Sequence, residues 1–115
     1  KVPVEISLDM EDDLPLNKGM ENHLFRIVQE ALSNTLRHAR ATKMGIELQR
    51  RGDAVRLGIR DNGVGFDILD KKHASYGLMN MEERVNELGG SFHVASAPGK
   101  GTRIEIRVPL MADGG

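Results

Sequence analysis

A chain of 115 residues is long enough for one domain with a hydrophobic core. Its net charge of −1 and its 3% of aromatic residues exclude a nucleic-acid binder that works by bulk charge or base stacking, so we expect no nucleic-acid partner. The absence of cysteine excludes a disulfide framework and a Cys-ligated metal site. No apolar run approaches the length of a membrane span, and we expect no direct membrane insertion by this domain.

The first half of the chain predicts a strand, a long helix and a hairpin. Apolar residues alternate over residues 2–10, which is typical of a strand, and an acidic loop follows over residues 11–17. From about residue 18 to 39 the apolar residues follow a helical period: Met20, Leu24, Ile27, Val28, Ala31 and Thr35, widened by Phe25, Leu32 and Leu36. The hairpin is predicted as a short strand, a turn and a second strand, at residues 46–48, 52–53 and 55–59.

The second half predicts a loop, a second helix and two more strands. Residues 67–75 have no sustained period and predict a mobile loop. The second helix is predicted by an apolar stripe that ends near Gly89: Leu78, Met81, Val85 and Leu88. Two strands, at residues 92–94 and 104–108, are joined by a turn at residues 98–101, and residues 111–115 form a tail. We expect one domain from residue 1 to 110, a two-layer α/β sandwich with helices on one face of a mixed sheet and a more polar second face.

The most informative segment runs from Arg60 to Phe66. Asp61 continues the alternation of the preceding strand, so its carboxylate is expected on the core-facing side, where it needs a donor. Gly63 and Gly65 permit a tight turn and the close approach of a ligand to the backbone. An exocyclic amine on a flat ligand such as adenine explains both features, and an ordinary Asp-Asn-Gly turn is the alternative.

Two features of the predicted helices suggest a phosphate and metal site. Glu30 and Asn34 lie on one side of the first helix, and their oxygen atoms suit Mg²⁺ with water ligands. The alternative is a solvated polar flank. Gly77 and Leu78 begin the second helix, whose free amides suit phosphate oxygens, and Lys72 lies in the preceding loop. An ordinary helix start and a solvated charge are the alternatives here.

A hydroxyl on the last strand suggests a second contact to the base. Thr102 follows Gly101 and shares the alternation of Ile104, so it is expected to face the core side. Its hydroxyl could join Asp61 at an adenine edge, directly or through water, although threonine is also common as a plain strand residue. The P-loop and dinucleotide fingerprints are missing, and the four histidines have no metal-ligand spacing.

Taken in order, these motifs resemble those of the GHKL ATP-binding family, which includes sensor histidine kinases, gyrase, MutL-type repair ATPases and Hsp90. They are Glu30-x-x-x-Asn34, Asp61-x-Gly63-x-Gly65, Gly77 and Gly99-Lys100-Gly101-Thr102. Within the family, residues 25–34 and 77–90 look like the NarL/DesK-type sensor kinases. The resemblance extends from about residue 2 to 110 and implies the Bergerat α/β sandwich.

The resemblance also implies a role for each matching residue. Asn34 would hold Mg²⁺, and Glu30 would orient the attacking group or an Mg²⁺-bound water. Asp61 would accept the adenine amine. The other implied nucleotide contacts are Arg37, His38, Gly63, Gly65, Lys72, Gly77, Leu78, Gly101 and Thr102. Residues 67–76 would form the ATP lid.

The implied function is that of the catalytic, ATP-binding domain of a sensor histidine kinase. It would donate the γ-phosphoryl group of ATP to a histidine on an upstream dimerisation hairpin that is absent from this chain, with a response regulator downstream. The chain looks like a domain cut from a longer protein, and we expect the cytoplasmic part of a membrane-anchored sensor. Alone, it is expected to bind ATP without autophosphorylation, because half of the positioning is missing. The alternatives are a nucleotide-binding regulatory module without turnover and a GHKL serine kinase of the anti-sigma type.

Overall fold

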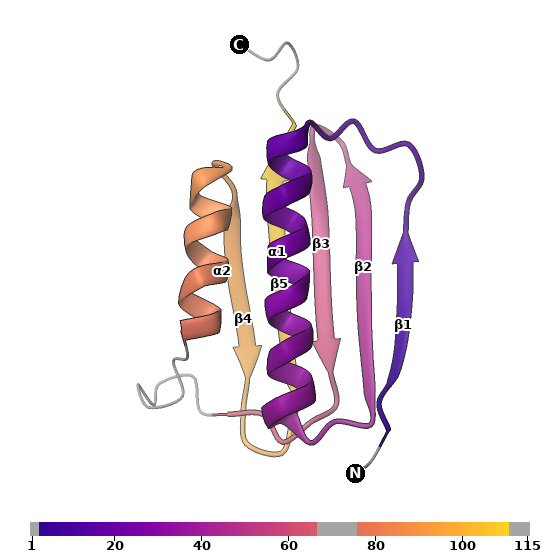
Figure 1. Cartoon of the computed structure of the whole chain (residues 1–115), viewed down its shortest axis with the longest axis vertical. Helices are drawn as coiled ribbons and strands as arrows, with labels where there is room; N and C mark the ends of the chain where they lie inside the picture. The colour runs from indigo at the N-terminus through magenta and orange to yellow at the C-terminus, as the bar shows by residue number, and fades with distance from the viewer. Residues whose placement is uncertain (1–2, 67–75, 111–115) are drawn as a thin grey trace.

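The computed structural model describes residues 3–66 and 76–110, and the predictions for the loop at 67–75, with Lys72, and for the tail at 111–115 lie outside these ranges. The elements are β1 (Glu5–Met10), α1 (Lys18–Asn34), the π-helical turn η1 (Thr35–Ala39), β2 (Lys43–Arg51), β3 (Ala54–Asp61), α2 (Tyr76–Glu87), β4 (Ser91–Ser96) and β5 (Thr102–Pro109). Helix α1 lies in front of the sheet in Figure 1, and α2 lies beside α1, near β4. Neither these helices nor any other helix in the described ranges is long and apolar enough to cross a membrane.

The described strands form one mixed sheet in the order β1-β2-β3-β5-β4. Strands β1 and β2 are parallel, and α1 lies on the crossover that a parallel pair requires. The other neighbouring pairs are antiparallel. Gly52, with φ of 62°, lies in the two-residue turn between β2 and β3, as the sequence predicted. The predicted two-layer α/β sandwich is confirmed.

The core lies between the helices and one face of the sheet. Its strand residues alternate as predicted: Met44, Ile46 and Leu48, then Val55, Leu57 and Ile59, then Ile104, Ile106 and Val108. The helices add Met20, Leu24, Ile27, Ala31, Met81 and Val85. The prediction that Phe25 and Leu36 widen this stripe is wrong, because their side chains are 61% and 57% exposed. A turn of 100° per residue carries Phe25 well past the buried Leu24.

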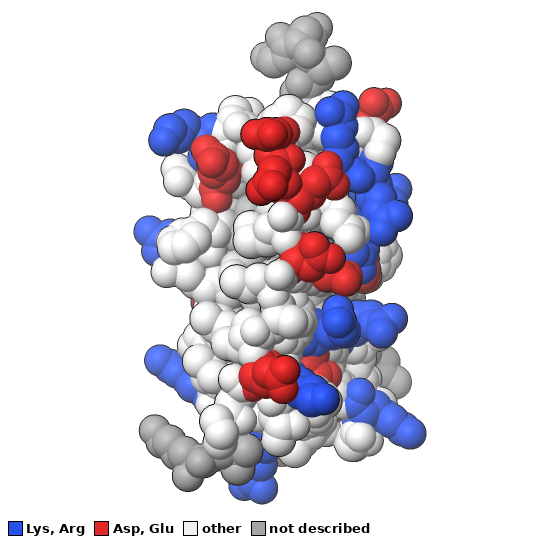
Figure 2. Space-filling view, turned by 90° about the vertical axis from the view of Figure 1, so that its right-hand side faces the viewer, with Lys and Arg blue, Asp and Glu red and all other residues white. Residues whose placement is uncertain are grey.

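Strand β1 differs from its neighbours because its apolar residues stay open to solvent. Ile6, Leu8 and Met10 are 40%, 64% and 56% exposed. Their partners on β2 are the buried core residues Met44, Ile46 and Leu48, so strand β1 extends the core face beyond the helices. Figure 2 looks onto this edge and shows a broad uncharged surface, with acidic side chains gathered near its upper end.

The second face of the sheet carries charged side chains, as expected. Arg56 on β3 donates from Nε to Oε2 of Glu105 at 2.8 Å and from Nη1 to Oε1 of Glu47 at 3.1 Å. The hydrogen bonds that Arg56 donates to Glu105, and then to Glu47, raise the pKa of Arg56 further above its ordinary value. The hydrogen bond from Arg56 lowers the pKa of Glu47, against an opposing effect of burial. This network joins β2, β3 and β5 on the side away from the helices.

Candidate functional site

Asp61, the last residue of β3, faces the helices as its place in the strand predicts. Its Oδ2 accepts a hydrogen bond from Oγ1 of Thr35 at 3.3 Å, and its Oδ1 accepts one from the amide of Gly63 at 2.8 Å. Thr35, at the start of η1, is 5% exposed, so its hydroxyl fixes the carboxylate from the helix layer. An ionised carboxylate has about four acceptor positions, and the carboxylate retains capacity for a ligand donor.

Two polar side chains continue a row from Asp61 across the neighbouring strands. Thr102 is the cross-strand partner of Asp61, and Ser96 is the partner of Thr102. Directly opposed antiparallel residues share one face, so Thr102 lies on the same face as Asp61, as its alternation predicted. The hydroxyl oxygens of Ser96 and Thr102 are 3.0 Å apart. Sequence reasoning missed Ser96, although it continues the alternation of Phe92 and Val94 on β4.

The glycines of this region permit close backbone packing. A Cβ at Gly63 would lie 2.2 Å from the carbonyl oxygen of Ala39, and one at Gly101 would lie 2.2 Å from that of Asp61. Gly65 has a φ of 66°, and a Cβ there would lie 2.1 Å from the carbonyl oxygen of Ala97. The segment after β3 is therefore held between the end of η1 and the β4–β5 turn. A side chain at any of these positions would push apart the walls that hold Asp61.

Glu30 and Asn34 meet the start of α2 at Gly77. A Cβ at Gly77 would lie 2.8 Å from Oε2 of Glu30, 2.6 Å from Nδ2 of Asn34 and 3.1 Å from Oδ1 of Asn34. Both side chains therefore point at one place, next to the first turn of α2. Thr35 follows Asn34 directly and contacts Asp61, so α1 and η1 connect this group to the row on the sheet.

The oxygen atoms of Glu30 and Asn34 form a donor set that fits Mg²⁺. Hard oxygen ligands in small number, with water and phosphate completing the octahedron, are the usual protein environment of this ion. Across the described parts of the chain, no group of three or more His, Cys, Asp or Glu residues could hold a metal.

The remaining predicted site residues are placed less closely. Arg37 is exposed on η1, and the side chain of His38 lies outside what the structure describes. Leu78, in the first turn of α2, is half-buried and packs against the core. The structure thus brings together two predicted groups, Asp61 with Thr102 and Glu30 with Asn34 and Gly77.

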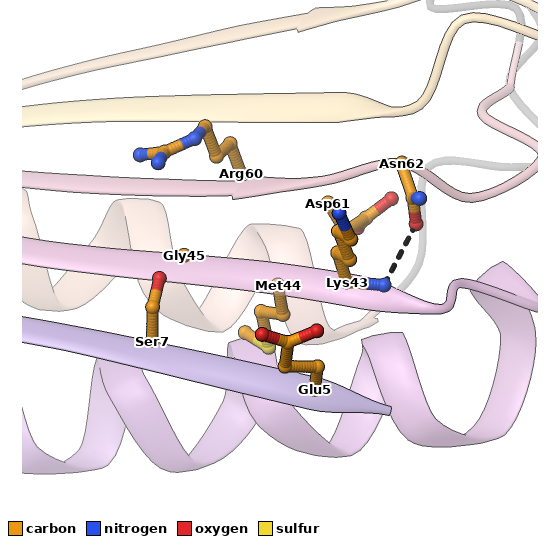
Figure 3. A pocket seen from close by; sticks show the side chains of 8 residues that line it. All are labelled: Glu5, Ser7, Lys43, Met44, Gly45, Arg60, Asp61 and Asn62. Carbon is orange, nitrogen blue, oxygen red and sulfur yellow. Dashed lines mark hydrogen bonds between the residues drawn. The ribbon is translucent and has the colours of Figure 1, made fainter. Parts of the chain in front are cut away.

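A hollow of about 280 Å³ also borders Asp61, and Figure 3 shows its lining. The lining residues are Glu5, Ser7, Lys43, Met44, Gly45, Arg60, Asp61 and Asn62. Five of these eight alternate with core-facing residues and so lie on the sheet face away from the helices. Asn62 has a structural role there, since its Oδ1 accepts hydrogen bonds from the amides of Thr42 and Lys43, both at 2.9 Å. The hollow is therefore separate from the group around Glu30.

Fold and site together define a small α/β domain with a polar site at one end of its helix–sheet interface. A family model described as "Histidine kinase-, DNA gyrase B-, and HSP90-like ATPase" matches residues 19–112. The sensor protein VraS of Staphylococcus saprophyticus is 53% identical over 110 residues, which cover 96% of this chain and 31% of that protein. VraS of Staphylococcus aureus is 50% identical over 110 residues, which again cover 96% of this chain and 31% of that protein.

Solved structures of histidine kinases share the fold. The histidine kinase domain of the blue-light activated kinase EL346 from Erythrobacter litoralis has a TM-score of 0.77 at 21% identity, over 96% of this chain and 53% of that one. The histidine kinase AdeS of Acinetobacter baumannii has a TM-score of 0.79 at 18% identity, over 95% and 55%. The chain belongs to the histidine kinase-, DNA gyrase B- and HSP90-like ATPase family, as its motifs predicted. It spans about 31% of the length of the VraS proteins that it matches.

Proposed function

We propose that this domain binds ATP with the adenine amine at Asp61 and the phosphates toward the first turn of α2. The observation that carries the proposal is the convergence of Asp61 and Thr102 with Glu30, Asn34 and Gly77 at one end of the helix–sheet interface. Asp61 supplies a fixed acceptor for an exocyclic amine. Gly77 and Leu78, in the first turn of α2, are the proposed phosphate contacts at this end, because a helix N-terminus suits anions.

The phosphate end has the groups needed to hold a charged chain of phosphates. Glu30 and Asn34 would hold Mg²⁺, which neutralises charge on the phosphate oxygens when bound. Arg37 extends from η1 as a phosphate contact, and His38 and Lys72 are proposed contacts by their position in the sequence. Glu30, beside the same space, would orient the attacking group.

We further propose that the parent protein is a sensor histidine kinase. The γ-phosphoryl group would pass to a histidine nitrogen on a helical hairpin of the parent, and ADP would leave. A response regulator would receive the group next, on the cytoplasmic side of a membrane-anchored sensor. Because phosphoryl transfer depends mostly on positioning and charge stabilisation, the domain and the hairpin each supply half of the site.

The binding step is tested by Asp61→Asn, which replaces an acceptor-only group with an amide. Loss of a charge-assisted hydrogen bond should cost about 1.5–3 kcal/mol, or roughly ten- to hundredfold in ADP affinity. Calorimetry with ADP measures this, and circular dichroism checks the fold. Asp53→Asn, on the exposed turn before β3, is the matched control and should bind like the parent chain. Equal ADP affinity in both variants would contradict the role of Asp61.

The transfer step is tested with γ-labelled ATP and Mg²⁺. The isolated chain should acquire no stable label, whereas added hairpin from the same parent should acquire an acid-labile, base-stable phosphoramidate. Glu30→Gln should reduce this transfer more than it weakens ATP binding, because its role is exerted mainly in the transition state. ATP binding without any transfer to the hairpin would favour a regulatory module. Strong labelling of a histidine in the isolated domain would overturn the assignment of the acceptor.

A further inference from the structure

The hydroxyl of Ser96, in the same row as Thr102 and Asp61, lies among three backbone and side-chain groups. Its oxygen accepts a hydrogen bond from the amide of Phe66 at 2.9 Å, and its proton is donated to the carbonyl oxygen of Gly101 at 2.8 Å. The hydroxyl oxygen of Thr102 lies 3.0 Å away. Ser96 therefore ties the end of the segment after β3 to the turn that precedes β5.

Counting protons in this network fixes the direction of the bond to Thr102. A hydroxyl carries one proton and two acceptor positions. The single proton of Ser96 goes to the Gly101 carbonyl, so the bond between the two hydroxyls must be donated by Thr102. This fills the second acceptor position of Ser96, beside the Phe66 amide. The proton of Thr102 is then committed to Ser96, and its oxygen offers only acceptor positions elsewhere.

Two acceptors therefore lie opposite each other where β3 ends and β5 begins. Asp61 and Thr102 are direct cross-strand partners, and both side chains are half-buried on the helix-facing side. An amine at position 6 of a purine has two N–H donors and suits two acceptors. A 6-oxo purine presents an acceptor at the same position and would face an oxygen at Thr102 with no proton to offer.

We infer that Ser96 is a specificity-determining positioning residue, which makes Thr102 an acceptor and so favours 6-amino over 6-oxo purine nucleotides. The inference rests on the proposed function, since it concerns the same base site. Ser96 acts through Thr102 and need not touch the base. Its removal would free the proton of Thr102, which could then be donated to a 6-oxo group.

The test compares ADP with IDP, whose base carries oxygen in place of the 6-amino group. Calorimetry on the parent chain should show a preference for ADP. Ser96→Ala should lower ADP affinity about three- to tenfold and IDP affinity by less, so the ratio of the two affinities narrows. Ser96→Thr keeps a hydroxyl on a strand residue and should restore the ratio. Ser91→Ala, at the exposed far end of β4, is the matched control and should leave both affinities unchanged.

A double variant separates orientation of Thr102 from a general effect on the fold. Thr102→Val should itself narrow the ratio, and adding Ser96→Ala should then change it no further, because Ser96 acts through the lost hydroxyl. Equal weakening of ADP and IDP in Ser96→Ala would overturn the inference and assign Ser96 a structural role. Unchanged affinities for both nucleotides in Ser96→Ala would also overturn the inference. In either case the proposed function would stand if ADP binding still depended on Asp61. If the parent chain bound neither nucleotide, the proposed function itself would fail.

Discussion

The two flanks of α1 differ in a way that separates function from stability. On the flank toward α2, Glu30 and Asn34 are polar, yet they pack against Gly77. The flank toward β1 carries Phe25, which is apolar and 61% exposed. Between the flanks, Ile27 is completely buried. Apolar residues stabilise this helix only where another layer covers them, and the two polar residues occupy a covered position at the proposed site.

The sheet shows the same contrast between β1 and β2. Leu8 and Ile46 are register partners with the same alternation, but their side chains are 64% and 3% exposed. The strand pattern alone is equal in the two cases. What differs is the layer above, since the two helices do not extend over β1 (Figure 1). Burial, and with it the contribution to stability, is therefore decided by the helix layer.

The largest effect should follow from a change between the two flanks. Ile27→Ala removes a fully buried side chain from the centre of the core and should lower the free energy of unfolding by about 2–5 kcal/mol. Urea unfolding measures this. A loss below about 1 kcal/mol would mean that the core relaxes around the cavity, and the contrast with the exposed flank would disappear.

A change at the polar flank should affect binding more than folding. In Gly77→Ala, the added methyl group would come within 3 Å of the side-chain ends of Glu30 and Asn34. These ends can move, so the fold should persist. Displacing them should cost about 1–3 kcal/mol of binding free energy, which would weaken Mg²⁺-ATP binding about tenfold or more. Asn80→Ala, on the exposed side of α2, is the control. Unchanged affinity in Gly77→Ala would show that the packed flank is structural only.

The smallest effect should come from the open flank. Phe25→Ser removes an exposed aromatic ring and should change the free energy of unfolding by roughly 0.5 kcal/mol or less, with ADP affinity unchanged. Urea unfolding beside Ile27→Ala measures the difference directly. A loss as large as that of Ile27→Ala would mean that Phe25 is covered in solution.

Local periodicity predicted most of the fold because it reports which face of an element is apolar. Both helices, the hairpin and the alternation of β3 and β5 follow from it, and so does the direction of Asp61. Periodicity did not predict that Phe25 and Leu36 would be exposed, because it does not show how far a neighbouring layer extends. Alternation likewise predicted β1 as a strand but did not indicate that its apolar residues would be exposed.

The site was predicted as a set of residue types and less well as a set of contacts. The sequence predicted correctly which helices and strands carry Glu30, Asn34, Asp61 and Thr102, and their roles in a site stay predictions. It did not reveal that Thr35 supports Asp61 or that Ser96 supports Thr102, because these bonds join residues that are paired only by tertiary packing and strand register. Gly63 and Gly65 were predicted to let a ligand approach the backbone, which stays a prediction, and the sequence did not reveal that a side chain at either position would meet a backbone carbonyl.

The π-helical turn η1 makes the length of this segment as important as its composition. A π turn carries one residue more than an α turn, and such turns are frequent at functional sites. The carbonyl oxygen of Ala39, at the end of η1, accepts a hydrogen bond from the amide of Val64 at 2.6 Å. Deleting one residue between Thr35 and Ala39 would leave the core stripe of α1 intact but rotate everything beyond it by about 100°. The hydrogen bond from Val64 to Ala39 would then be lost, and η1 would no longer position the segment after β3. Deleting one residue here should therefore reduce ADP affinity more than Leu36→Ala does.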